Sequence, residues 1–252
     1  TASFQSPGDG DGVTTLSRAL VMLGQEGIRR VASSIRAWPG ALAAQVSLNA
    51  DEGATAVAVL AGELRRHCIA GHVARLMAPF SIQDEEAALA AMAQSLGPAL
   101  IAYHFPEEAA QIMRLMQELP ATEPEGRPTP GMQPDSAVSA VLGVEMDELT
   151  AAVLRHWGLH ERLLSAARPL SRSNPVRKPV TREETLRTVA SLANELAASV
   201  LLELEKQPSA VHQVYTRYAR ALELTPKECI QNLELATRLV DGGRRAEVVS
   251  PT

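Results

Sequence analysis

The segment EEAALAAMAQSLGPALIAYHF, residues 85–105, constrains the fold more than any other part of the chain. Wound into a helix, it is apolar on nearly every side, and such a helix normally lies at the centre of a globular bundle. Its apolar run falls short of the ~20 residues that are needed to span a bilayer. The sequence therefore predicts that residues 86–104 form a helix in the core of a helical domain.

The composition favours helices throughout the rest of the chain. Hydrophobic residues make up 46% of the 252 residues but aromatic residues only 3%, so the core must be built mainly from Ala, Leu, Val and Ile. Strands are typically rich in β-branched and aromatic residues that alternate with polar ones, and we find no convincing run of this kind. We expect an all-α fold without strands.

Several other segments carry apolar residues at three- and four-residue intervals, which is the spacing of one helical face. The longest covers residues 51–77. Gly24 is predicted to break or bend a helix that starts after Thr15, and Thr181 begins a capping-box pattern before another long helix. Residues 120–134 contain five prolines and predict an exposed loop. About ten helices are expected in all. Besides those already described, one starts at Pro106, and the rest cover residues 135–142, 145–156, 160–169, 209–223 and 226–239.

The net charge and the cysteine content limit the kinds of partner and the cellular location that we expect for the protein. A net charge of −5 gives no general attraction to nucleic acid or to an anionic membrane, so both are disfavoured as partners. Cys68 and Cys229 lie far apart, which suggests neither a disulfide framework nor a CxxC metal site. A cytoplasmic location is expected. Because the chain begins at Thr1 with a polar, Gly-rich stretch, residues 1–12 are predicted to be flexible and a longer parent protein is expected upstream.

Few patterns suggest a catalytic or metal site. His67 and His72 would lie about 140° apart around a helix, so they cannot readily share a metal. His156 and His160 have helical spacing, but a glycine lies between them and a helix end is the simpler interpretation. The segment 8–12, GDGDG, resembles a calcium loop without its later Glu. The motifs GxxxxGKS/T, GxGxxG, GxSxG and HExxH do not occur in the sequence, and no metal or cofactor is predicted.

Four basic residues gather around a proline-rich turn just before the helix that Thr181 opens: Arg172, Arg177, Lys178 and Arg182. Backbone N–H groups at the start of that helix could help them to bind an anion or a partner. A solvated basic loop is the simpler alternative, because such patches are common on surfaces that bind no ligand.

Three segments carry a pattern known from one family. The first segment, LSRALVMLGQEGIRRVASSI, contains a stretch similar to Ala-Ile-x-x-Leu-Gly-x-x-x-Leu-Arg. The second, residues 85–108, contains the apolar helix followed by Phe105-Pro106. The third, VLGVEMDELTAAVLRHWGLHERLLSAA, is similar to Phe-Gly-x-Asp-His-x-Glu-Leu-Gly. Together they resemble the HDOD family, the HD-related output domains of bacterial signalling. The later RKPVTREETLR resembles the tail of members that are joined to serine/threonine kinase domains.

The resemblance implies an HD-like orthogonal bundle over residues 13–200, with residues 201–252 packed on it or appended to it. It also implies that the metal site of true HD hydrolases is degenerate. By this resemblance, the positions of the family's metal ligands are occupied here by residues of other types, namely Gln94, Ser95, Met146 and Arg168. His67 would lie near the same ancestral pocket. A metal hydrolase needs acidic or imidazole ligands that converge on the ion, so no catalytic residue is predicted.

The leading expectation is a non-catalytic HDOD-like regulatory module that acts through protein–protein interaction, within a longer signalling protein. Its partners would be other signalling proteins or a kinase or receiver domain of the same polypeptide, with a homo-oligomer left open. The alternative is a degenerate HD-type phosphohydrolase or nucleotide-binding domain. A helix-turn-helix DNA binder is a third reading, which the acidic balance disfavours.

Overall fold

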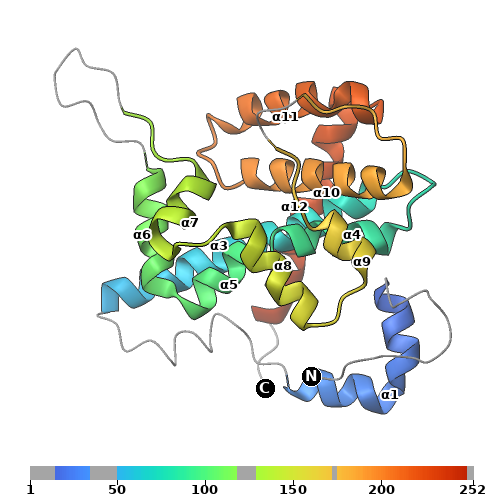
Figure 1. The fold of residues 1–252 in the computed structure, drawn as a ribbon, viewed down its shortest axis with the longest axis horizontal. Helices are drawn as coiled ribbons and strands as arrows, with labels where there is room; N and C mark the ends of the chain where they lie inside the picture. Colours follow the sequence, from blue (N-terminus) through green and yellow to red (C-terminus); the bar gives the residue numbers. More distant parts are fainter. Residues whose placement is uncertain (1–14, 35–49, 118–128, 172–174, 249–252) are drawn as a thin grey trace.

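The computed structural model describes residues 15–34, 50–117, 129–171 and 175–248 (Figure 1). Eleven helices and no strand lie within these ranges, which confirms the all-α prediction. No helix in them combines the length and the apolar character that crossing a bilayer requires. The helices are α1 (Leu16–Ser34), α3 (Ala50–Leu76), α4 (Asp84–Gln94), α5 (Leu96–His104), α6 (Pro106–Met116), α7 (Pro134–Leu142), α8 (Met146–His156), α9 (Glu161–Ala166), α10 (Arg182–Ser199), α11 (Gln207–Leu222) and α12 (Pro226–Val248).

The centre of the bundle is α3, which packs against α4, α5, α6, α10 and α12. Its inward side carries Leu60, Ile69 and Val73, all of them fully buried. The main core is completed by small residues of α4, such as Ala87 and Ala90, and by the leucines of α10. Alanine on facing helices lets the helix axes approach closely. With few aromatic side chains to fill space between helices, the core depends on this close packing.

Helices α11 and α12 contribute to the same core. Tyr218 of α11 is fully buried, and Leu233 and Ala236 of α12 belong to the cluster that also contains the α3 and α10 side chains. The sequence predicted an end near residue 239, but α12 continues to Val248. Arg65 of α3 donates two hydrogen bonds of 2.9 Å to the carboxylate of Asp241, and this long-range contact holds the helix beyond its predicted end.

The predicted helix over residues 86–104 is two helices. Ser95 separates α4 from α5, with a backbone conformation of φ −94 and ψ 5 that interrupts the α-helix. Pro98 explains the break, because proline has no N–H to donate to the carbonyl of Gln94 and its ring would clash with that carbonyl. Most of the segment is buried as predicted, although His104 is exposed.

The outer segments follow local backbone rules. Gly24 has φ 63 and ψ 175 inside α1, which confirms the predicted bend. The loop predicted for residues 120–134 ends one residue early, since Pro134 is the first residue of α7, a position that tolerates proline. Most of that loop, and the predicted flexible segment 1–12, lie outside the described residues.

Candidate functional site

The side chain of Gln94 connects three helices at the buried end of α4. Its Nε2 donates hydrogen bonds to the carbonyl of Ala166, at 2.7 Å, and to Oγ of Ser191, at 3.2 Å. Its Oε1 accepts a hydrogen bond of 3.3 Å from the amide of Asn194. Gln94 therefore joins α4 to the end of α9 and to α10. Both the nitrogen and the oxygen of its amide are hydrogen-bonded within the protein.

Ser95 forms a second buried polar contact at this point. Its Oγ lies 2.8 Å from Nδ1 of His67 on α3, and it donates toward the carbonyls of Ala91 and Met92. Burial, and then the charge of Arg66, lower the pKa of His67 from 6.5 to about 4, so the imidazole is neutral near pH 7. Only 2% of Ser95 is exposed, so its hydroxyl is closed to a substrate.

We expect the protein to lose about 2 kcal/mol of stability between pH 7 and pH 5 through His67 alone. The folded-state pKa of about 4 lies below the ordinary value of 6.5, so protons bind the unfolded chain preferentially as the pH falls through this window. Urea unfolding at both pH values measures the loss. The variant His67→Gln, which cannot titrate, should show a smaller loss by that amount, and an equal loss in both proteins would contradict the assignment.

Met146 and Arg168 line a pocket of about 530 Å³ beside these buried contacts. Gly97 lets α5 lie directly against α8 here, because a Cβ at that position would stand only 2.5 Å from Sδ of Met146 and from Oγ1 of Thr150. The carbonyl of Arg168 lies 3.5 Å from Nε2 of Gln94, which connects the pocket to the buried network. The structure thus places the four positions that the resemblance marks, Gln94, Ser95, Met146 and Arg168, in one region.

This pocket is acidic on balance, with four carboxylates and two guanidinium groups. Partial burial, and then the charge of Asp135, raise the pKa of Asp147, while Arg168 and Arg187 oppose that rise. Arg187 also donates hydrogen bonds to the carbonyls of Arg168 and Pro169, which fixes the chain after α9. The charged lining residues are Asp135, Glu145, Asp147, Glu148, Arg155 and Arg168.

The four predicted basic residues do not act as one group in the structure. Nζ of Lys178 pairs with Glu223 at 2.5 Å, and Arg182 pairs with the buried carboxylate of Glu86. Arg177 is exposed, whereas Arg172 lies outside the described residues. Anion binding by this segment stays a prediction, although two of its charges are already balanced by carboxylates of the chain.

The other candidate metal ligands lie apart. His160 is the N-cap residue of α9, where its Nδ1 accepts a hydrogen bond of 3.2 Å from the backbone N–H of Arg162, so the helix-end interpretation is confirmed. His156 is exposed at the end of α8, and the calcium-like segment 8–12 lies outside the described residues. Across the part of the chain that the structure describes, no three His, Cys, Asp or Glu residues are placed to hold a metal ion.

Sequence reasoning missed the polar partners of Gln94 and the acidic lining of the pocket. Ser191 and Asn194 interrupt the apolar face of α10, and two polar residues on an otherwise buried face are a signal of a buried hydrogen-bond network. Asp147 and Glu148 suit the first turn of α8 for reasons of helix dipole alone, so nothing local marks them as pocket residues.

Comparison with known proteins identifies the family. The family model of the HDOD domain matches residues 7–171, well over half of the 252 residues. Searches of curated proteins and of solved structures returned no match. The matched range contains α1 and α3–α9, and with them the Ser95 contact with His67, the Gln94 contact with Ala166 and the acidic pocket, whereas Ser191 and Asn194 lie beyond it. The chain therefore belongs to the HDOD family of signalling-associated domains.

Proposed function

We propose that this HDOD domain is a non-catalytic regulatory module of a signalling protein and that it works by binding other proteins. One observation carries the proposal: Gln94 and Ser95, which the resemblance aligns with the metal ligands of HD hydrolases, are committed to buried hydrogen bonds within the protein. An ion at this position would have to break those bonds and would gain an amide and a hydroxyl, which are weak ligands for a catalytic metal.

The surroundings of His67 support the same proposal. Its Nδ1 is already bonded to Ser95, and its side chain lies on α3 facing the α4–α5 junction. A catalytic metal site needs several converging ligands and an open coordination position for water or substrate. Here the polar groups of His67, Ser95 and Gln94 join α3, α4, α9 and α10, as a binding scaffold requires.

The exposed part of this region is suited to a partner. The acidic pocket faces solvent beside α8, and its carboxylates could pair with basic side chains of another protein. Other signalling proteins, or a kinase or receiver domain of the same polypeptide, are the partners we propose, in the cytoplasm.

Metal analysis and a hydrolysis assay test the non-catalytic proposal. We expect that the purified chain, after incubation with Mn²⁺, Fe²⁺ or Zn²⁺ and desalting, retains no stoichiometric metal and does not hydrolyse an aryl phosphodiester. The variant His67→Gln is the matched control. A metal-dependent activity that is present in the wild type and lost in this variant would overturn the proposal.

The alternative, a degenerate nucleotide-binding domain, has one observation in its favour, because Arg155 and Arg168 line the pocket and guanidinium groups bind phosphates. Four carboxylates in the same lining oppose an anionic ligand. Calorimetric titration with cyclic dinucleotides decides between the two, since saturable binding that is lost in Arg168→Ala would favour the nucleotide-binding function.

A further inference from the structure

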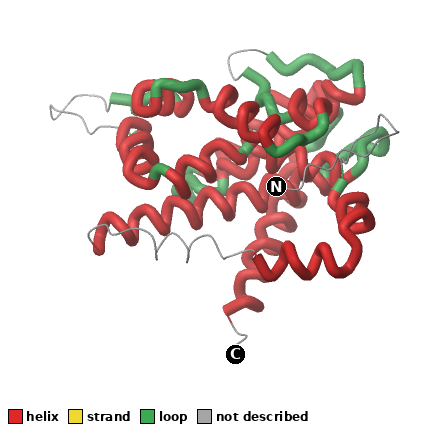
Figure 2. Tube along the Cα trace, turned by 60° about the horizontal axis from the view of Figure 1, so that its bottom comes forward, coloured by secondary structure: helices red, strands yellow, loops and turns green. Residues whose placement is uncertain are grey.

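Helix α1 stands apart from the rest of the molecule. Figures 1 and 2 both show it at the edge of the structure, outside the bundle around α3. It packs along its length against no other described helix, and none of residues 17–30 is buried. Three of its large apolar residues are exposed, namely Leu20, Val21 and Met22. Residues 17–30 therefore contribute nothing to the described core.

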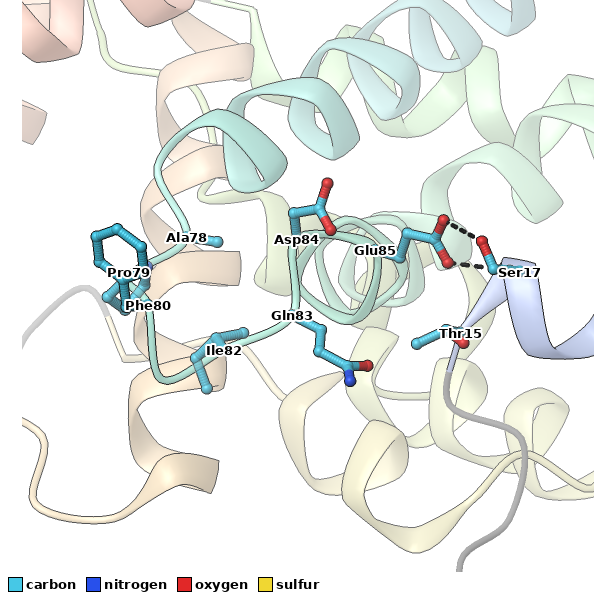
Figure 3. Close-up of a pocket in the computed structure, with 9 residues that line it drawn as sticks. All are labelled: Thr15, Ser17, Ala78, Pro79, Phe80, Ile82, Gln83, Asp84 and Glu85. Atoms are coloured by element: carbon cyan, nitrogen blue, oxygen red, sulfur yellow. Dashed lines mark hydrogen bonds between the residues drawn. The ribbon is translucent and has the colours of Figure 1, made fainter.

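The carboxylate of Glu85 joins the first turn of α1 to the bundle. Glu85, in the first turn of α4, accepts a hydrogen bond of 2.9 Å from the backbone N–H of Ser17 and one of 2.5 Å from its hydroxyl (Figure 3). These bonds with Ser17 lower the pKa of Glu85. The carboxylate lies at the N-termini of two helices at once, where free N–H groups and the helix dipole favour negative charge.

The helix is poorly suited to exist alone. Gly24, with φ 63 and ψ 175, divides α1 into two halves. Each half is shorter than the ~12–15 residues below which an isolated helix is marginal in water. Attachment and helix formation of α1 are therefore coupled, because the local contacts that α1 would keep, such as the Glu26–Arg29 ion pair, are exposed and weak.

The attached end of α1 also forms part of the lining of a cavity. Thr15 and Ser17 form one wall of a cavity of about 510 Å³, and the turn between α3 and α4 forms the other wall with Phe80, Ile82 and Gln83 (Figure 3). Ile82 is a core residue with 5% of its surface exposed, whereas Phe80 is fully exposed. Without α1 this cavity loses a wall.

We infer that α1 is an order–disorder strap, held by the ionised carboxylate of Glu85 through Ser17. In the attached state it is helical and forms one wall of the cavity beside the α3–α4 turn. In the released state it unfolds and that wall is lost, while the bundle around α3 stays intact. The inference stands independently of the proposed function, because it concerns neither Gln94 nor the acidic pocket.

Hydrogen exchange on the whole chain at pH 7 tests the strap. In Glu85→Ala, we expect the amides of residues 18–30 to exchange roughly tenfold faster, because both hydrogen bonds from Ser17 are lost. The core amides of α3 and α10 should exchange as in the wild type. Asp84→Ala is the matched control, because Asp84 lies in the same turn but bonds to Arg75, at 2.8 Å, and it should leave α1 unchanged.

Ser17→Ala keeps the test decisive if Glu85→Ala destabilises the whole bundle. Ser17 is exposed and contributes nothing to the core, so its variant should raise exchange in α1 alone, by a smaller factor. Equal exchange of α1 in the wild type and both variants would overturn the inference. So would an equal rise in Asp84→Ala, or an α1 that is already fully exchanged in the wild type at the shortest time.

Discussion

Replacing Arg182 with methionine is expected to lower the free energy of unfolding by about 3 kcal/mol. Glu86, its partner on α4, is only 2% exposed, whereas the Arg182 side chain is 46% exposed. Removing the guanidinium leaves a carboxylate buried without its counter-ion, and an unpaired buried charge is among the costliest defects in a folded protein. Urea unfolding at pH 7 measures the difference.

The control for this prediction lies four residues earlier. Lys178→Met breaks an ion pair with Glu223 in which both side chains are mostly exposed, so it should change stability by no more than about 1 kcal/mol. The double variant Glu86→Met, Arg182→Met should recover much of the loss, because it removes both charges together. Equal losses in Arg182→Met and Lys178→Met would show that burial of Glu86 does not govern the effect.

Local patterns predicted those helices whose ends are set by neighbouring residues. The capping box at the start of α10 forms as expected, since Oγ1 of Thr181 accepts from the N–H of Glu184 at 3.1 Å and Glu184 accepts from the N–H of Thr181. The bend at Gly24 is likewise a property of one residue. Such features need no knowledge of the rest of the fold.

The misplaced boundaries have different physical causes. Pro98 was visible in the sequence, but the apolar run around it concealed that a proline in the first turn of α5 must end α4 at Gln94. The end of α12 was not visible locally, because the contact between Arg65 and Asp241 joins residues 176 positions apart. Tertiary contacts of this kind outweigh the helix-breaking tendency of the glycines that follow Asp241.

The candidate site, too, was predictable only in part from the sequence. Resemblance to the family marked Gln94 and Ser95, but it could not show what their side chains contact. The partners Ala166 and Ser191 lie 72 and 97 positions further along the chain. Periodicity assigns residues to a face of a helix, whereas hydrogen-bond partners depend on which faces meet, and that is a property of the packed bundle.

The second large effect is expected for Gln94→Met, which should lower the free energy of unfolding by about 3 kcal/mol. Methionine has nearly the size of glutamine, so the variant removes the amide without opening a large cavity. The carbonyl of Ala166 then loses its closest donor, and the Ser191 hydroxyl and the Asn194 amide lose the Gln94 oxygen. Gln111→Met, on the exposed side of α6, is the control and should change stability by less than about 0.5 kcal/mol.

A double-mutant cycle with Ser191→Ala tests whether these contacts act as one network. Because Ser191 and Gln94 are bonded to each other, their losses should be non-additive by about 1 kcal/mol, whereas the losses of distant residues add. A stable Gln94→Met, with no coupling to Ser191, would mean that the amide is dispensable at this position. The buried hydrogen bonds of Gln94 would then no longer argue against a metal ion at this position, and the non-catalytic proposal would lose its main support.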